Sequence, residues 1–438
     1  MRWYRSFLAM LFFVQLGCVK KEKPLPPSQE KGSLAFVKTL GGSKNEVAHS
    51  ATATTDGGYA IAGYTQSNDQ DITGKPDEGF DYWVLKYSAN STLEWQQTFG
   101  GSADDRAKDI IQTTDGGYAV LGYAKSTDGD LTENAGAQDF WLLKLDASGN
   151  KIWQKSIGFS GADYGTAVTQ TIDGGYVITG ALDVTSSGGE GNFNRHAGGD
   201  YWALKLSATG VLEWSRYFGG SYTDIPYGIV QTATGELLIV GSSDSNDVDI
   251  SANNGAYDFW IVKISSTGAL LWEKSYGGSQ IDEARGIVAT HDGHFLVVGD
   301  TRSEDGMVAL NNGAADLWVL KINAEGEVLW TKTIGGTSFD VARAVYQTAE
   351  NGFLLAGSSR STTNTYTNKG QNDAYFVQID TDGNVEWEQN IGGTEIDYLY
   401  DVVALQDGSI VGVGESSSAN GDIPENKGFT DVLLIKLY

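Results

Sequence analysis

Carboxylates are the side chains whose spacing in this chain could most directly do chemistry. Seven repeated units each carry one acid five residues after the start of a Gly-Gly-like pair, and a second acid opens a later strand. The first series is Glu46, Asp105, Asp163, Asp224, Asp282, Asp340 and Asp397, and the second is Asp81, Asp139, Asp200, Asp258, Asp316, Asp373 and Asp431. A unique active site would break this symmetry. We therefore interpret both series as acceptors for backbone N–H groups of neighbouring tight loops.

A less regular set of acids falls in long polar loops. Stretches such as NDQDI, TDGDL and NDVDI alternate carboxylates with turn-forming residues. The set comprises Asp69, Asp71, Asp128, Asp130, Asp247, Asp249 and Asp422. Because Ca²⁺ takes roughly six to eight oxygen ligands, a calcium site at Asp128, Asp130, Asp247 and Asp249 is one hypothesis. The alternative, which we favour, is solvated loops rich in turn formers, since no stretch matches an EF-hand loop.

Histidine and cysteine are too few for most nucleophilic or metal chemistry. The chain has four histidines and one cysteine, Cys18. His291 and His294 fall in a hairpin, THDGH, whose counterparts read TTDGG, and His49 falls in a first strand. His196 lies in a long loop and is the one histidine placed for ligand contact. With no metal-ligand spacing and no triad, we expect no enzyme activity and no cofactor apart from the possible calcium.

The start of the chain has the pattern of a bacterial secretion signal. Arg2 and Arg5 precede an apolar stretch at residues 7–16, which is too short to span a membrane and ends at Gly17-Cys18. This resembles the lipobox of bacterial lipoproteins, in which the peptide is cut before a cysteine that is then lipidated. We expect a signal peptide over residues 1–17 and lipidation of Cys18. An ordinary signal peptide with an incidental cysteine is the alternative.

The residues after Cys18 indicate a tether. Val19 is non-acidic, which resembles the outer-membrane address of Gram-negative lipoproteins. Residues 18–32 hold three of the six prolines and no apolar period. They should form an extended segment of at most roughly 40 Å. The expected location is the bacterial cell envelope, at the outer membrane, with the lipid as the sole membrane contact.

Seven copies of one unit occupy the rest of the chain. Their Gly-Gly-like pairs start at Gly41, Gly100, Gly158, Gly219, Gly277, Gly335 and Gly392, at intervals of 57–61 residues. In the second unit, strands are expected at 107–112, 118–124, 139–145 and 151–157. Tight glycine turns join them, except for a long polar loop at 125–138. Four antiparallel strands in a unit of this length are typical of one propeller blade.

The two ends of the repeat region complement each other. The last unit stops after residues 431–437, which match a third strand, whereas residues 33–40 match a fourth strand and precede the first unit. Pairing them would close the ring and leave no open sheet edge. The predicted fold is therefore an all-β, seven-bladed β-propeller over residues 33–438, with residues 33–40 completing the last blade.

Tryptophan recurs at two positions of the unit. Eleven of the twelve tryptophans lie in third or fourth strands. They are Trp83, Trp141, Trp202, Trp260 and Trp318 in the third strands and Trp95, Trp153, Trp214, Trp272, Trp330 and Trp387 in the fourth. Because they recur in nearly every unit, we interpret them as packing between blades rather than as sugar-stacking platforms.

Two motifs carry a resemblance to known families. The turn at residues 146–149 (DASG) followed by Trp153 resembles the tryptophan-docking repeats of quinoprotein-like propellers. Asp-Gly-Gly-Tyr at residues 56–59, 115–118 and 173–176 resembles the signature of bacterial surface propellers with repeats near sixty residues. The resemblance implies the fold, but propellers host many unrelated activities. Quinone catalysis is not expected, because that family is longer, usually eight-bladed, and often has an adjacent cysteine pair.

Charge and loop variability indicate the kind of partner. A net charge of −26 disfavours nucleic acid, and variable loops on a rigid frame are usual recognition sites. We predict a monomeric, non-catalytic scaffold that binds an outer-membrane or envelope protein through its long-loop face, similar in outline to the propeller lipoproteins that assist outer-membrane assembly. The alternative is a glycan-binding surface lipoprotein, and a hydrolase or lyase ranks behind both. The candidate ligand or partner face comprises Asp69, Asp71, Asp128, Asp130, His196, Asp247, Asp249, Asn253, Tyr257 and Asp422. A glycan would contact Tyr222, Asn253, Asn254 and Tyr257.

Overall fold

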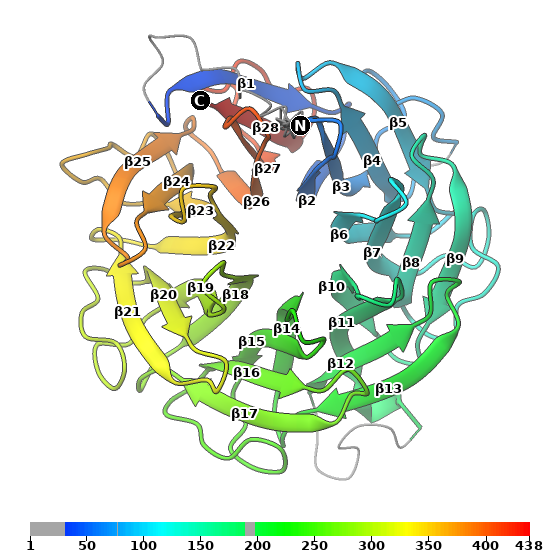
Figure 1. Cartoon of the computed structure of the whole chain (residues 1–438). Coiled ribbons are helices and arrows are strands. Elements are labelled where there is room, and N and C mark those ends of the chain that lie inside the picture. Colours follow the sequence, from blue (N-terminus) through cyan, green and yellow to red (C-terminus); the bar gives the residue numbers. More distant parts are fainter. Residues whose placement is uncertain (1–30, 77, 189–197) are drawn as a thin grey trace, which may run out of the picture.

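The computed structural model describes residues 31–76, 78–188 and 198–438. It contains 28 strands in seven four-stranded antiparallel sheets, arranged as blades around a ring (Figure 1). The predicted all-β, seven-bladed propeller is confirmed. Within the described ranges, the single helical element is a 3₁₀ turn, η1 (Val184–Ser186), and no helix has the length and apolar character needed to cross a membrane.

The two inner strands of each blade form a hairpin beside the central axis. The innermost strands are β2 (Glu46–Ala53), β6 (Asp105–Gln112), β10 (Tyr164–Gln170), β14 (Asp224–Gln231), β18 (Asp282–Ala289), β22 (Asp340–Gln347) and β26 (Asp397–Ala404). The second strands are β3 (Tyr59–Thr65), β7 (Tyr118–Ala124), β11 (Tyr176–Asp183), β15 (Leu237–Ser243), β19 (Phe295–Thr301), β23 (Phe353–Ser359) and β27 (Ile410–Ser416). Their short turns define one face of the ring, which we call the hairpin face.

The two outer strands follow a long loop. The third strands are β4 (Asp81–Tyr87), β8 (Asp139–Leu145), β12 (Gly199–Leu206), β16 (Asp258–Ile264), β20 (Asp316–Ile322), β24 (Asp373–Ile379) and β28 (Asp431–Leu437). The outermost strands are β5 (Leu93–Phe99), β9 (Lys151–Ile157), β13 (Leu212–Phe218), β17 (Leu270–Tyr276), β21 (Val328–Ile334), β25 (Val385–Ile391) and β1 (Leu34–Leu40). The loops between second and third strands define the opposite, long-loop face.

The first and last strands of the chain share one sheet. Its order is β1-β28-β27-β26, and β1 pairs with β28 from Leu34↔Leu437 to Leu40↔Val432. Figure 1 shows β1 and β28 side by side where the two ends of the ring meet. The expected closure by residues 33–40 is thus observed, and it removes the open edge that β28 would otherwise present.

The strand limits differ from the sequence pattern at one point. We expected the first strand of the second unit to begin at residue 107, whereas β6 begins at Asp105. The Asp105 N–H donates to the Phe80 carbonyl at 2.6 Å, which extends the strand to the acid itself. The first acid series therefore marks the first residue of six of the seven innermost strands.

The hydrophobic core lies between blades. One buried cluster combines Ala60 and Tyr82 of the first blade with Tyr118 and Trp141 of the second. The Tyr82 hydroxyl donates to the Trp141 carbonyl at 2.9 Å, so the buried hydroxyl has a hydrogen-bond partner across the same interface. The third-strand tryptophans therefore pack one blade against the next, as their repetition predicts.

The outermost tryptophans dock on glycines of the following blade. The turn glycine Gly149 has φ +82°, and a Cβ there would lie 2.9 Å from the Trp95 ring. The arrangement repeats around the ring and ends with Gly32 against Trp387, so it continues across the closure. The remaining pairs are Gly210–Trp153, Gly268–Trp214, Gly326–Trp272 and Gly383–Trp330.

The two acid series flank the Gly-Gly pair of each blade. In the fifth blade, Asp282 accepts the Gly278 N–H at 2.7 Å, and a Cβ at Gly277 would lie 2.4 Å from Asp258 Oδ1. Asp258 also accepts the Asn254 N–H at 2.6 Å. These contacts agree with the loop-bracing interpretation of both series.

A buried lysine explains the Asp-Gly-Gly signature. In the second blade, Lys144 Nζ lies 2.9 Å from Asp115 Oδ2, and Asp115 Oδ1 accepts the Gly117 N–H at 3.0 Å. Although burial opposes it, hydrogen bonds from Thr113 and Lys144 lower the pKa of Asp115 to about 2. The same pair recurs as Lys86–Asp56, Lys205–Asp173, Lys263–Glu236 and Lys321–Asp292.

Asp115→Ala should lower the free energy of unfolding at neutral pH by about 1–3 kcal/mol, because Lys144 keeps a buried ammonium without its carboxylate. Urea denaturation would measure this. Combining it with Lys144→Met should restore part of the loss, since the unpaired charge is gone. An equal loss in the double variant would instead assign the effect to the turn bonds of Asp115.

Candidate functional site

The innermost strands all carry a β-bulge at the same position. Pairing with the second strand skips one residue in each blade, for example between Ala48 and Ser50 in β2. The skipped residue lies three positions after the acid and lines the central cavity. We call these seven residues the channel ring: His49, Lys108, Thr166, Tyr227, Arg285, Arg343 and Tyr400.

A glycine of the second strand permits each bulge. A Cβ at Gly63 would lie 1.9 Å from the Val47 carbonyl oxygen, which the bulge brings over the strand. The corresponding distances in the other blades are 1.8–2.1 Å. These glycines are Gly122, Gly180, Gly241, Gly299, Gly357 and Gly414. The glycines and the bulges together aim the channel ring inward.

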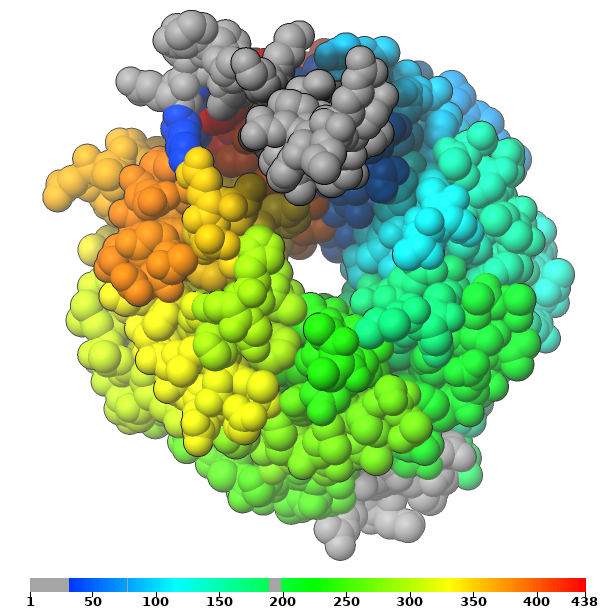
Figure 2. Space-filling model, viewed as in Figure 1, coloured from blue at the N-terminus to red at the C-terminus, as the bar shows by residue number. Residues whose placement is uncertain are grey.

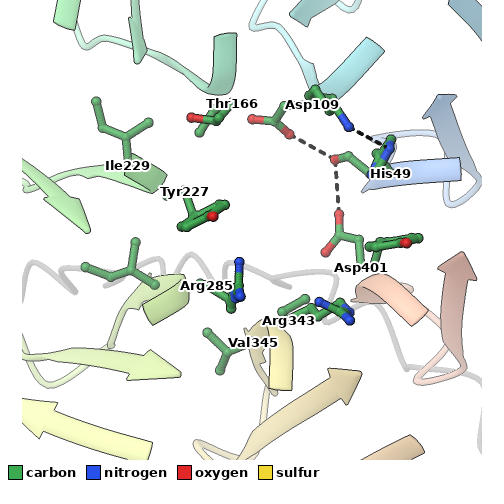
Figure 3. A pocket seen from close by; sticks show the side chains of 17 residues that line it. His49, Asp109, Thr166, Tyr227, Ile229, Arg285, Arg343, Val345 and Asp401 are labelled. Carbon is green, nitrogen blue, oxygen red and sulfur yellow. Dashed lines mark hydrogen bonds between the residues drawn. The ribbon is translucent and has the colours of Figure 1, made fainter. Parts of the chain in front are cut away.

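The channel ring surrounds two adjoining hollows on the axis, where the space-filling view is open (Figure 2). The outer hollow, of about 250 Å³, also touches Tyr164 near the long-loop face. The deeper hollow, of about 220 Å³, has Ile229, Ile287 and Val345 on one side. Opposite them stand Asp109 and Asp401 (Figure 3). The site is therefore asymmetric, although the blades that build it are alike.

Four members of the ring form a continuous arc over blades six, seven, one and two. The Arg343 guanidinium lies 5.3 Å from the Tyr400 ring centroid, and that ring lies 4.7 Å from the His49 ring. His49 Nε2 lies 2.9 Å from Lys108 Nζ. Two cations thus flank an aromatic pair, a geometry in which ring faces stabilise positive charge.

The protonation of this arc follows from its charges. Burial, and then the charges of Lys108 and Arg343, hold the pKa of His49 well below its ordinary value. Burial and the Arg106 charge lower the pKa of Lys108 to about 8. At neutral pH the Lys108 ammonium therefore donates to a neutral imidazole.

Arg285 has a different environment. Its guanidinium donates to Glu283 at 2.8 Å, lies 3.8 Å from Asp300, and stands 4.7 Å from the Tyr227 ring centroid. Burial would lower the pKa of Arg285, but Tyr227, Glu283 and Asp300 raise it. Burial raises the pKa of Asp300 to about 6, opposed by the Arg285 charge. The positive charge of Arg285 is therefore largely offset by Glu283 and Asp300.

A carboxyl pair closes the deeper hollow. Ser50 Oγ lies 2.9 Å from Asp109 Oδ1 and 3.1 Å from Asp401 Oδ2. Asp109 accepts the Val168 N–H at 2.7 Å, and Asp401 accepts the Ala51 N–H at 2.8 Å. Asp401 therefore joins blade seven to blade one, and Asp109 joins blade two to blade three.

Below about pH 7 the pair holds one proton. Burial raises the pKa of Asp401 to about 7, and the charge of Asp109 adds to the shift. Burial likewise raises the pKa of Asp109 to about 6. The Ser50 hydroxyl can donate to one carboxylate only, so a proton on Asp401 lets Asp401 donate to Ser50 while Ser50 donates to Asp109.

The long-loop acids predicted as a ligand face brace backbone instead of meeting at one point. Asp128 accepts the Ser102 N–H at 2.8 Å and Asp130 the Gly100 N–H at 3.2 Å. Asp69, Asp71, Asp247, Asp249 and Asp422 make the corresponding bonds in their own blades. In addition, Asp71 pairs with Lys427, and Asp422 pairs with Lys369, each at 2.6 Å.

The calcium hypothesis for Asp128, Asp130, Asp247 and Asp249 stays a prediction. In the part of the chain that the structure describes, no three histidine, cysteine or acidic residues form a group able to hold a metal ion. A melting temperature that is the same in excess chelator and in millimolar Ca²⁺ would dismiss it.

The other predicted contacts are placed as follows. Asn253 donates to the Ser243 and Ser245 carbonyls at 3.2 Å, and Asn254 donates to Asp258 at 2.8 Å, so both amides serve their own loop. Tyr257 lies beside Ile281 of the next blade in a parallel bridge. His196 and Cys18 lie outside the described residues.

The channel ring was missed in the sequence because its members share no residue type. The signal was positional: the third residue after each acid of the first series. Read across the units, that position gives two arginines, a lysine and a histidine in a strongly acidic chain. Chemically, this arrangement can bind a small anion, and it supplies the asymmetry that the repeated acids lack.

Comparisons with known proteins found distant similarities only. No family model matches the chain. The chain is similar to regulatory protein FlaEY of Caulobacter vibrioides, with 23% identity over 430 residues that cover 88% of this chain and 45% of the relative. It therefore spans less than half the length of that curated relative.

Two solved structures are among the matches. The Pan2 WD40 domain of Neurospora crassa is 10% identical, with 93% of this chain and 97% of that chain covered and a TM-score of 0.49. Drosophila Plexin A in complex with Semaphorin 1b is 8% identical, with 93% and 88% covered and a TM-score of 0.49. The propeller assignment itself rests on the strand topology described above.

Proposed function

We propose that this chain is a non-catalytic, monomeric binding propeller of the bacterial cell envelope, lipid-anchored at Cys18 at the outer membrane. In this proposal it engages an envelope protein through the long-loop face. The observation that carries the proposal is the difference between the two faces of the ring. The surfaces of the ring carry this proposal, because a propeller fold by itself implies no function.

The hairpin face is regular, whereas the long-loop face varies. Turns on the hairpin face close on themselves, as where the Thr113 N–H donates to the Gly117 carbonyl at 2.9 Å. The long-loop face carries exposed apolar side chains of mixed type, aromatic and aliphatic together. These are Tyr222, Val248, Met307, Leu310, Phe339 and Phe429. Exposed apolar side chains of mixed type favour a protein partner over a glycan, which would call for aromatic platforms.

The position of the first strand supports the orientation. Leu34 pairs with Leu437 at the end of β28, so the chain enters β1 from the hairpin face. A lipid attached upstream, at Cys18, would hold that face toward the membrane and leave the long-loop face available to a partner. A tether over residues 18–32, of at most roughly 40 Å, would allow this.

In the described channel, neither Ser50 nor His49 is arranged for catalysis. Ser50 is hydrogen-bonded between two carboxyl groups, and His49 Nε2 accepts from Lys108. Neither forms the nucleophile–base–orienter sequence that hydrolases use. The channel is therefore better suited to binding than to bond cleavage.

The test is cross-linking in native cells followed by purification of the full-length lipoprotein and mass spectrometry. We expect one stoichiometric envelope protein, and Phe429→Ser combined with Tyr222→Ser should reduce its recovery about tenfold by removing two apolar contacts. Phe429 and Ile172 are both 71% exposed, on the long-loop and hairpin faces respectively. Ile172→Ser is the matched control and should change nothing.

Two outcomes would contradict the proposal. If Ile172→Ser reduced recovery as strongly as the long-loop variant, the binding face would be wrong. If the lipoprotein came down alone after efficient cross-linking, a protein partner would be excluded and the glycan-binding alternative would take its place.

A further inference from the structure

We propose that the central channel binds a small organic anion, whose carboxylate or phosphate group pairs with Arg343 while Lys108 adds positive charge at the other end of the same arc. This site goes beyond the proposed function, because it lies inside the ring rather than on the long-loop face. Figure 3 shows Arg343 pointing into the space that His49 also lines.

The buried lysines of five third strands are paired with carboxylates, whereas no carboxylate of the described chain pairs with Lys108 or Arg343. The third-strand lysines of blades one to five are buried, and each lies 2.8–3.1 Å from a carboxylate. Lys108 and Arg343, among the described residues, have no carboxylate within 4.0 Å and are in contact with rings instead. Arg343 Nε is buried with no hydrogen-bond partner in those ranges. A desolvated cation without an anion is costly unless a ligand supplies one.

Lys108 and Arg343 come from blades two and six and lie at the two ends of one arc, with His49 and Tyr400 between them. Arg343 presents a planar fork that suits carboxylate and phosphate, whereas Lys108 adds a point charge to the same arc. An anion bound at Arg343 would also favour the protonated form of Lys108, whose pKa burial lowers to about 8.

Neighbouring carboxylates are already engaged. The Tyr400 hydroxyl donates to Glu415 at 2.7 Å, and Glu283 and Asp300 face Arg285. Glu415 interacts at longer range with Arg343 and Lys108, and burial raises its pKa. Glu283 and Asp300 offset the charge of Arg285, and Glu415 reduces the positive potential near Lys108 and Arg343. None of these carboxylates lies within 4.0 Å of Lys108 or Arg343, so a ligand anion can contact these cations.

The shape of the site limits the ligand. The outer hollow of about 250 Å³ is below the usual roughly 300–1,000 Å³ of drug-sized sites, so the ligand is small. Tyr164, Tyr227 and Thr166 line it and offer ring faces and hydroxyls for a polar body. Deeper in the channel, Asp109 and Asp401 would repel a second anionic group. The ligand should therefore carry its charge at one end.

The experiment is isothermal titration calorimetry on the full chain in detergent at low ionic strength. The probes are glucuronate, glucose 6-phosphate and glucose, which differ in carrying a carboxylate, a phosphate or no charge. We expect at least one anionic probe to bind at least tenfold more tightly than glucose, and to weaken as salt is added. Which of the two binds better identifies the head group.

Arg343→Gln should weaken binding of the anionic probe about ten- to hundredfold, as expected for loss of one charge-assisted contact, and Lys108→Met should weaken it to a smaller extent through loss of a nearby positive charge. Lys155→Gln, an exposed site on β9, removes the same charge and should have no effect. Lys108→Met should keep or raise the melting temperature, because it removes a buried charge that no carboxylate pairs.

Three results would overturn the proposal: equal binding of glucose and both anions, no binding of either anion at millimolar concentration, or unchanged affinity in both channel variants. Arg343→Lys guards against a folding defect, since it keeps the charge and should retain intermediate affinity. A folded Arg343→Lys protein with wild-type affinity would dismiss the contribution of the guanidinium fork.

Discussion

Replacing Gly357 by alanine should destabilise the protein by about 3 kcal/mol and displace Arg343 from the channel. A Cβ at Gly357 would lie 1.8 Å from the Val341 carbonyl oxygen, an overlap with backbone that no rotamer change relieves. Gly357 pairs with Ala342, directly before the bulge at Arg343. Relief therefore requires the innermost strand β22 to move, and the bulge with it.

Urea denaturation and probe titration should show these two effects together. The control is Gly199→Ala in β12, where the nearest atom to an added Cβ lies at 3.5 Å, an ordinary contact. That variant should stay within about 0.5 kcal/mol of wild type. A Gly357→Ala protein with wild-type stability would show that the bulge is not fixed by the glycine.

The architecture could be predicted because each blade repeats the same local chemistry. Gly-Gly pairs, Asp-Gly-Gly turns and strand tryptophans each satisfy a contact that recurs around the ring, so their spacing alone gives the blade and its boundaries. The closing strand was visible for the same reason, since residues 33–40 carry the fourth-strand pattern without a unit of their own. Repetition makes structural residues conspicuous.

The channel site could not be predicted in this way, because function there depends on departure from the repeat. The position that holds Lys108 in one blade holds Thr166 in the next and Tyr227 in the one after, so no motif marks it. A β-bulge also shifts the alternation of inward and outward side chains, which hides the ring from a simple period-two pattern. The second-strand glycine was visible in every unit, but its role follows only from the backbone that crosses it.

The long-loop acids are a different case. The alternate carboxylates of Asp128 and Asp130 allowed either a calcium site or a loop rich in turn formers, and each acid bonds backbone N–H groups of the Gly-Gly turn. Sequence spacing does not distinguish a carboxylate that binds an ion from one that braces a loop, because both need convergent oxygens.

The carboxyl pair beside the channel should make stability depend on pH between about 4 and 7. The pKa of Asp401 is about 7 in the folded chain, compared with 3.8 ordinarily. Between those values the native state holds more protons than the unfolded state. The free energy of unfolding therefore falls as pH rises through this window, and Asp401 adds no further change above it.

Asp401→Asn should remove that dependence. With its oxygen in the place of Oδ2, the amide keeps the acceptor for the Ala51 N–H and for the Ser50 hydroxyl, but it does not ionise. Since one pKa unit corresponds to about 1.4 kcal/mol, the variant should gain about 2 kcal/mol relative to wild type between pH 5 and pH 8, after a discount for partial solvation. Urea titrations at both pH values measure this difference.

The matched control is Asp380→Asn, another acid-to-amide change. Hydrogen bonds from Asn384 lower the pKa of Asp380, so its titration lies below the window and its offset from wild type should be the same at pH 5 and pH 8. If Asp401→Asn also gave a constant offset, Asp401 would be ionised throughout, and the proton shared with Ser50 and Asp109 would have to lie on Asp109. Asp109→Asn would then show the pH-dependent gain instead, because the proton that the pair holds below about pH 7 would lie on Asp109.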